Sequence, residues 1–315
     1  MLTAKDQLLL VLLRLRLGLF ERDLAYRFRV SIATLSRIYT TWISFIYLQV
    51  GQVDLWLSRD KVDKAMPAIF KERYPSTRTI TDATEVRCEV PSSLVLQLAT
   101  YSTYKSTITM KGLVVISPDG TITFLSKLFT GSVSDKELVE KSGFLKLEFE
   151  PGDSVMADKG FKIYDLLSAK GVALNIPHFL RRQHLNEEEV RQTEEIASLL
   201  RIHVERRIQR IKAFDIFDRP SPLSITSIIN EIWALCAFLS NLQSPLMATL
   251  DLQQQQSYCS DVQGVNSRVQ SESSQKQECF RPPERLYEKH TRGTSPREAV
   301  DYGSAPAEVT ARSSV

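Results

Sequence analysis

Four acidic residues, Asp82, Asp135, Asp158 and Glu205, lie on predicted elements that could bring them to one site. Asp158 ends a short apolar run, which predicts a strand buried on both faces. Ligands bind beyond the carboxyl ends of strands in open α/β sheets, so this position favours a site. Asp82 lies inside an earlier β-rich run, Asp135 opens a predicted helix, and Glu205 lies at the edge of the apolar stripe of a long helix.

Carboxylates that share a site repel one another and raise one another's pKa, so such a site needs a cation. Hard oxygen ligands favour Mg²⁺ or Mn²⁺. With two such ions, carboxylates can deprotonate a water or a 3′ hydroxyl and stabilise both oxygens of a phosphodiester displacement. The phosphate-binding motif GxxxxGK[ST] does not occur, so an ATPase or another use of a nucleotide cofactor is not supported.

Each acid also has an ordinary structural interpretation, because charged side chains are usually solvated. Sequence spacing alone leaves both interpretations open. The structural alternatives are a hydrogen bond of Asp82 to Thr84, a helix-terminal role for Asp135, a pair of Asp158 with Lys159, and an i,i+4 pair of Glu205 with Arg201.

The elements that must position these acids follow one another along the middle of the chain. Five strands are predicted, and the turn Pro118-Asp119-Gly120 joins two of them as a hairpin. A helix opens at Asp135, and a short helix separates the last two strands. The predicted strands are Thr79–Val86, Gly112–Ser117, Thr121–Leu128, the run ending at Asp158, and Gly171–Pro177.

A long helix is predicted over Leu185–Phe214, with Asn186 as its cap and a charge order that suits the helix dipole. Glu205 lies about 60° from Ile208 on the helical wheel, which puts it near the core without burying it. A final apolar helix, Ile225–Leu242, completes the domain.

The first fifty residues show the periodicity of three helices, with Ser31 as the cap of the third. This arrangement is typical of a helix-turn-helix, in which the early residues of the second helix of the motif reach base edges in the major groove. A plain three-helix bundle with a basic face is the alternative. The candidate DNA-binding residues are Arg27 and Arg29 near phosphates, and Thr34, Ser36 and Arg37 near bases.

The composition of the 315-residue chain is that of a globular protein with a core, at 43% hydrophobic residues. Its net charge of +3 is too small to indicate a polyanionic partner. The four cysteines lack metal-ligand spacing, which favours free thiols in a reducing compartment. The apolar run Leu8–Leu13 is too short to cross a bilayer, and the basic residues that follow it do not fit a signal peptide.

Taken together, the motifs closely resemble the DDE superfamily endonuclease domain of transposases of the Harbinger and IS4-like groups, and the N-terminal part resembles the helix-turn-helix that precedes it. The similarity runs from about Thr79 to Pro245. The motifs that carry it are Thr81-Asp82-Ala83-Thr84-Glu85-Val86, Pro91-Ser92-Ser93, Ala99-Thr100-Tyr101-Ser102-Thr103-Tyr104-Lys105, Gly131-Ser132-Val133-Ser134-Asp135-Lys136-Glu137-Leu138, Ala157-Asp158-Lys159-Gly160-Phe161, Leu174-Asn175-Ile176-Pro177 and His203-Val204-Glu205-Arg206.

The resemblance implies an α/β fold with a ribonuclease H-like mixed sheet flanked by helices, behind a small all-α helix-turn-helix domain. It also implies a divalent-metal DNA endonuclease with Asp82, Asp158 and Glu205 as the catalytic acids and Asp135 as an additional metal-site acid. Lys159 stands where arginine is commoner in the family, which keeps the charge but loses the fork for bidentate phosphate contact.

The predicted organisation is a helix-turn-helix at 1–50, a linker helix at 51–78, the nuclease at 79–245 and a disordered tail at 246–315. We expect a nuclear protein whose partner is DNA, with Arg181, Arg182, Arg206, Arg207 and Arg210 offering phosphate contacts. A homo-oligomer or a partner protein stays open, and no membrane association is expected. The alternative function is a domesticated transposase-derived protein that binds DNA or serves as a scaffold without cutting.

Overall fold

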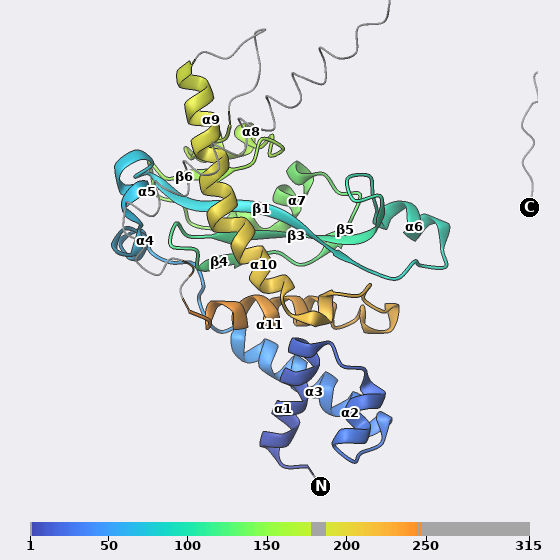
Figure 1. Cartoon of the computed structure of the whole chain (residues 1–315). Helices are drawn as coiled ribbons and strands as arrows, with labels where there is room; N and C mark the ends of the chain where they lie inside the picture. The colour runs from blue at the N-terminus through green and yellow to red at the C-terminus, as the bar shows by residue number, and fades with distance from the viewer. Residues whose placement is uncertain (1, 178–186, 245, 247–315) are drawn as a thin grey trace, which may run out of the picture. The chain divides into compact units, whose positions relative to one another are not determined.

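The computed structural model describes residues 2–177, 187–244 and 246 (Figure 1). Within these ranges, helices and a mixed sheet form one α/β arrangement, in agreement with the predicted ribonuclease H-like class. None of the helices in this part of the chain has the length and apolar character needed to cross a membrane.

Three helices open the chain: α1 (Ala4–Leu17), α2 (Glu21–Arg27) and α3 (Ile32–Val50). Thr3 caps α1 in a reciprocal capping box, and the Ser31 side chain accepts a hydrogen bond from the Thr34 amide at the start of α3, as the sequence predicts. The helices pack through buried apolar side chains that belong to the same core as the last helix, α11 (Ile229–Asn241). At this contact the Ser44 hydroxyl donates to Glu231 Oε2 over 2.7 Å.

The segment predicted as one linker helix contains two short helices, α4 (Arg59–Ala65) and α5 (Ala68–Arg73), and residues 51–58 are not helical. The break falls at Met66-Pro67, where Met66 is extended with ψ 126°. Proline disfavours the helical conformation of the residue before it, so the helix ends there.

The described residues form a seven-stranded mixed sheet with β1 (Thr77–Arg87) at its centre. On one side β1 pairs antiparallel with β3 (Thr107–Ile116), and on the other it pairs parallel with β6 (Ser154–Ala157). The remaining strands are β7 (Ala173–Asn175), parallel to β6, and β2 (Tyr101–Ser102), β4 (Ile122–Leu125) and β5 (Phe129–Thr130), all antiparallel to β3.

Each face of the sheet has its own buried core, because successive strand residues point to opposite faces. Ile80 and Met156 face the core made with the later helices, whereas Val155 and Ala157 face the core made with α7 (Asp135–Ser142) and α8 (Tyr164–Ser168). This alternation determines the face of the sheet toward which an acid on β1, or one just after β6, is directed.

The long predicted helix is divided into α9 (Glu187–Leu200), a π-helical turn η2 (Arg201–Glu205) and α10 (Arg206–Lys212), which cross over β1 and β3 (Figure 1). Short 3-10 turns at Phe144–Lys146, Asp215–Phe217 and Leu223–Ile225 complete the connections. The last helix, α11 (Ile229–Asn241), starts four residues later than predicted and buries Trp233 and Cys236.

Helix α6 (Leu94–Thr100) and the short strand β2 are the main elements that the sequence did not predict. α6 buries none of its residues, and Leu98 is 77% exposed. An apolar run without one-sided periodicity gives no helical signal, which explains why the pattern missed it.

Several sequence predictions fall outside the described residues. They include Arg181, Arg182, the proposed cap Asn186, and the disorder predicted for 246–315 apart from Leu246. Of the four cysteines predicted to be free thiols, Cys88 and Cys236 lie in the described part, where both are free and buried.

Candidate active site

The parallel pairing of β1 with β6 brings two of the predicted acids beside each other, Asp82 in the middle of β1 and Asp158 just after the end of β6. The two strands run parallel with Thr81 opposite Ala157, so Asp82 and Asp158 are the next residues of each strand path. Ala157 faces the core on the α7 side, so the alternation turns the following residue toward the face covered by η2 and α10. Asp82 shares that face with Ile80.

Glu205 reaches the same face from the helical layer. It is the last residue of the π-helical turn η2, which packs against β1 and β3. Its side chain is exposed, while the preceding His203 and Val204 are buried. A π turn changes the direction in which a helix presents its side chains and is frequent at functional sites.

Asp135 approaches from the other side as the first residue of α7, whose N-cap Ser134 accepts a hydrogen bond from the Glu137 amide. Its Oδ1 lies 3.0 Å from Lys111 Nζ on β3. Its Oδ2 lies 3.3 Å from the position that a Cβ on Gly160 would occupy, two residues after Asp158. Asp135 therefore lies between β3 and the loop that carries Asp158.

The electrostatics couple the four acids. Burial raises the pKa of Asp82 to about 7, and the negative charges of Asp158, Glu205 and Asp135 add to the rise. The hydrogen bond that the Ala83 amide donates to Asp82 Oδ1, at 2.7 Å, acts in the opposite direction. A carboxylate that burial keeps protonated near neutral pH, with other carboxylates close enough to add to the rise in its pKa, is typical of a site that receives a cation.

The donor set fits Mg²⁺ or Mn²⁺ in its chemistry, since all four side chains offer hard oxygen ligands. Among the described residues, however, no group of three or more His, Cys, Asp or Glu side chains is arranged to hold a metal ion. The acids interact through their charges without forming a closed coordination shell.

The observed contacts of Asp82 and Asp135 can be compared with the purely structural roles that the sequence suggested for them. Asp82 accepts its hydrogen bond from the backbone of Ala83. Asp135 has an ion pair with Lys111 in addition to its helix-terminal position. The suggested pair of Glu205 with Arg201 involves a side chain outside the described part of the chain.

Two lysines at the site were missed by the sequence reading. Lys111 interrupts the apolar pattern of β3 between Met110 and Gly112, and that interruption is the signal that could have revealed it. Lys212, at the end of α10, has its pKa lowered first by burial and then by Lys105, while Glu85 and Asp82 oppose the shift. It is therefore close enough to the acids to sense their charge.

Buried basic groups nearby have structural roles. Arg207 donates to the Gly120 and Ser240 carbonyl oxygens over 2.7 and 2.6 Å. His203 packs edge-on against Phe70, and burial lowers the pKa of His203 to about 4, so the imidazole is neutral near pH 7. Of the predicted phosphate contacts, Arg207 is thus already engaged inside the fold.

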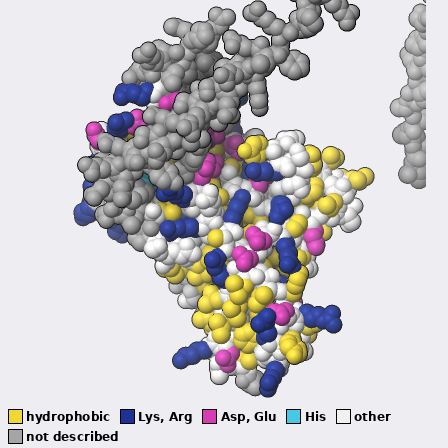
Figure 2. All heavy atoms as spheres, viewed as in Figure 1, with side chains coloured by type: hydrophobic (Ala, Val, Ile, Leu, Met, Phe, Trp, Pro, Cys, Tyr) yellow, Lys and Arg dark blue, Asp and Glu magenta, His cyan; other side chains and the backbone are white. Residues whose placement is uncertain are grey.

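The predicted DNA-binding residues lie around the turn between α2 and α3. Arg37 is exposed on α3, and Arg29 is exposed in the turn, where its φ of 53° is unusual for a residue with a side chain. Arg27 forms an i,i+4 ion pair with Asp23 at 2.8 Å. Thr34 and Ser36 are half-buried, and the Thr34 hydroxyl lies 2.8 Å from Ser31 Oγ. In Figure 2, Lys and Arg side chains stand around the end of the molecule that these helices form.

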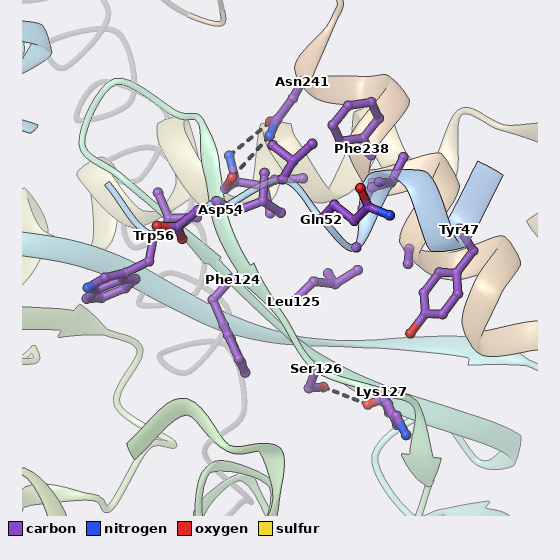
Figure 3. A pocket seen from close by; sticks show the side chains of 18 of the residues that line it. Tyr47, Gln52, Asp54, Trp56, Phe124, Leu125, Ser126, Lys127, Phe238 and Asn241 are labelled. Carbon is purple, nitrogen blue, oxygen red and sulfur yellow. Dashed lines mark hydrogen bonds between the residues drawn. The ribbon is translucent and has the colours of Figure 1, made fainter. Parts of the chain in front are cut away.

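A cavity of about 510 Å³ lies elsewhere, between the end of α3, residues 51–56, β4 and α11 (Figure 3). Its lining is mainly apolar, with Trp56, Phe124 and Phe238 among the side chains drawn. Asn241 at its rim exchanges two hydrogen bonds with the backbone of Ile122. None of the four acids lines this cavity, so it is not the candidate active site.

Comparisons with protein families agree with this arrangement. The model of the DDE superfamily endonuclease matches residues 81–241, and the model of the helix-turn-helix of DDE superfamily endonuclease matches residues 1–51. No curated protein and no solved structure matches the chain. The first match covers about half of the 315 residues and includes all four acids. The chain therefore belongs to the DDE superfamily endonucleases, with the helix-turn-helix of that superfamily at its N-terminal end.

Proposed function

We propose that the protein is a divalent-metal-dependent DNA endonuclease of the transposase type, with Asp82, Asp158 and Glu205 as its catalytic acids. The observation that supports this proposal is the electrostatic coupling of Asp82, in the middle of β1 and beside the end of β6, to the other three acids. Family membership supports the endonuclease class. Asp135 belongs to the proposal as the additional acid of the metal site.

Asp82, Asp158 and Glu205 would hold the metal, with Asp135 beside them. Bound Mg²⁺ or Mn²⁺ would supply an activated water or 3′ hydroxyl and neutralise charge on the phosphodiester. Asp82 must lose its proton to become a ligand, and its pKa of about 7 makes this step sensitive to pH near neutrality. Lys212 and Lys159 offer positive charge to the DNA backbone beside the acids.

The helix-turn-helix would dock the DNA, with Arg37 and the early residues of α3 toward bases and Arg27 and Arg29 toward phosphates. Because the proposed substrate is DNA, we also propose that the protein acts in the nucleus. Replacing Arg37 by alanine should weaken binding and, if Arg37 touches a phosphate, reduce the salt slope of log K by about one.

The direct test is nicking of labelled supercoiled DNA by the full chain with Mg²⁺ or Mn²⁺. We expect the wild type to cleave the DNA. Cleavage should be lost when EDTA removes the metal, and it should also be lost in the Glu205→Gln variant. Glu140→Gln is the matched control, because Glu140 is an exposed acid on α7 that is not among the charges raising the pKa of Asp82. Equal cleavage by wild type and Glu205→Gln would contradict the proposal.

A second candidate is a DNA-binding or scaffold protein that keeps the nuclease fold without cutting. It is favoured by the finding that no described group of acids is arranged to hold a metal ion. It predicts salt-sensitive DNA binding that survives the acid substitutions, together with no heat of Mn²⁺ binding in calorimetry. Metal binding by wild type that is lost in Glu205→Gln would decide against it.

A further inference from the structure

Lys111 contacts one of the four acids directly and is held by further groups around it. Its Nζ lies 3.0 Å from Asp135 Oδ1, 3.1 Å from the Val133 carbonyl oxygen and 4.0 Å from Glu85 Oε1. The Lys111 side chain is 14% exposed and that of Asp135 is 27% exposed. A pair at this depth is less screened by solvent than a surface pair.

Glu85 does not compete strongly for this lysine, because other groups already satisfy it. Ser102 Oγ donates to Glu85 Oε1 over 3.0 Å, and Thr109 Oγ1 donates to Oε2 over 2.9 Å. Glu85 is therefore only a distant partner of Lys111, at 4.0 Å, and the short contact of the Lys111 ammonium is made with Asp135, at 3.0 Å.

The second oxygen of Asp135 is turned toward the loop that follows β6. It would lie 3.3 Å from a Cβ on Gly160, a separation tighter than most side-chain contacts. The chain of contacts thus runs from Glu85 through Lys111 and Asp135 to the Asp158–Gly160 loop. It links β3 and the start of α7 to the strand end that carries an acid of the site.

We propose that Lys111 is a positioning residue of the acid site, acting through Asp135 on the loop that carries Asp158. The inference rests on the proposed function, because it assigns Lys111 a part in that same site. Lys111 fixes Asp135 Oδ1 and leaves Oδ2 directed at the loop. It also offsets the negative charge of Asp135, one of the four acids.

Because Lys111 both holds Asp135 and offsets its charge, removing it should change metal affinity and nicking rate in opposite directions. A simple loss of packing would lower both. In Lys111→Met the site becomes more negative, so Mn²⁺ should bind about tenfold more tightly to the metal-free protein. Asp135 loses its anchor, so nicking at saturating metal should slow by between about tenfold and about 100-fold. Lys111→Arg keeps the charge and should restore most of both properties.

The experiment measures Mn²⁺ affinity by calorimetry and nicking at saturating Mn²⁺ for the full chain. Lys136→Met is the matched control, because Lys136 follows Asp135 on α7 and pairs with Asp165 at 2.6 Å on the surface. It should leave both quantities unchanged. Tighter metal binding with slower nicking in Lys111→Met, reversed in Lys111→Arg, is the expected result.

Two other outcomes have separate meanings. A wild type that neither binds Mn²⁺ nor nicks DNA refutes the proposed function, and the inference with it. A wild type that does both, while Lys111→Met behaves as Lys136→Met does or loses affinity and rate together, overturns the inference alone. A double-variant cycle of Lys111→Met with Asp135→Asn, read as unfolding constants, should show about fivefold coupling in the metal-free protein, and its absence would also overturn the inference.

Discussion

Strand β6 has an aspartate immediately before its first residue and another immediately after its last, and the two acids have opposite surroundings. Asp153 precedes the strand and its side chain is 2% exposed, whereas Asp158 follows it and is exposed. Four residues separate two carboxylates of the same type. Their partners, and not their chemistry or their strand, decide what each one does.

Asp153 is surrounded by basic groups and donors. Arg59 Nη1 lies 3.1 Å from its Oδ1, Arg78 Nε lies 3.9 Å from its Oδ2, and the Glu150 amide donates to Oδ2 over 2.8 Å. A buried carboxylate satisfied in this way supports the fold. Asp158 instead adds negative charge beside Asp82, and under the proposed function a bound cation would relieve this repulsion.

The largest expected effect tests the functional member of this comparison. Asp158→Asn should reduce nicking by about 10³-fold, since a lost metal ligand removes several kcal/mol of transition-state stabilisation. Its free energy of unfolding should change by less than about 0.5 kcal/mol, as for other exposed positions. Nicking rates and urea unfolding of the same preparation check both values. A large loss of stability would remove the distinction between the two aspartates.

The next largest effect concerns Asp153, the aspartate that supports the fold. Asp153→Ala should lower the free energy of unfolding by about 2–3 kcal/mol, because Arg59, Arg78 and the Glu150 amide lose a buried acceptor, although Asp63 and Glu150 still offset the two guanidinium charges. Urea denaturation measures it. If the folded fraction of this variant nicks DNA at the wild-type rate, Asp153 has no part in the chemistry, as the comparison requires.

The third prediction uses the pKa of Asp82. The folded protein raises it from 3.8 to about 7, so without metal the folded state holds this proton more tightly than the unfolded state does. The stability that Asp82 contributes is complete below about pH 4 and is lost as pH rises through about 7. Asp82→Asn should therefore stabilise the metal-free protein by about 2 kcal/mol at pH 8 and have little effect at pH 4.

Urea unfolding at the two pH values, with EDTA present, makes this measurement. Added Mg²⁺ should remove the advantage of Asp82→Asn at pH 8, because a bound cation favours the carboxylate of the wild type. Equal stability of the two proteins at both pH values would contradict the raised pKa of Asp82.

The smallest effect compares two acids that share one arginine. Arg59 pairs with Asp153 and also with Asp63, at 2.8 Å, whose side chain is 49% exposed. Asp63→Ala should cost only about 0.3–0.5 kcal/mol, as measured for exposed i,i+4 pairs. Thermal unfolding of Asp63→Ala and Asp153→Ala, each compared with the wild type, gives the ratio of the two stability losses. Comparable losses would mean that burial does not govern the strength of these pairs.

Much of the fold could be predicted from sequence because its signals are local. The N-terminal helices, the cap at Ser31, the helix opening at Asp135 and the hairpin at Pro118-Asp119-Gly120 all depend on a few neighbouring residues. Strand ends were less accurate: β3 begins at Thr107, five residues before the predicted start. Pairing with β1 and β2 extends it through Met110 and Lys111, where apolar alternation is weak.

The acids show the same division. Their identities and order along the chain are properties of the sequence, and the motifs around Asp82, Asp158 and Glu205 were sufficient to indicate the family. The contrast between Asp153 and Asp158 could not be predicted, because Arg59 and Arg78 are 94 and 75 positions from Asp153 by number and meet it only through the pairing of β1 with β6.

The sequence by itself determined the superfamily, the four acids and the local elements that carry them. The tertiary structure alone decided that Lys111 pairs with Asp135, that Glu205 ends a π-helical turn, and that burial raises the pKa of Asp82 to about 7. Local backbone preferences are set by adjacent residues, whereas charge interactions depend on distance in space and on burial. Those two quantities exist only once the strands and helices have packed.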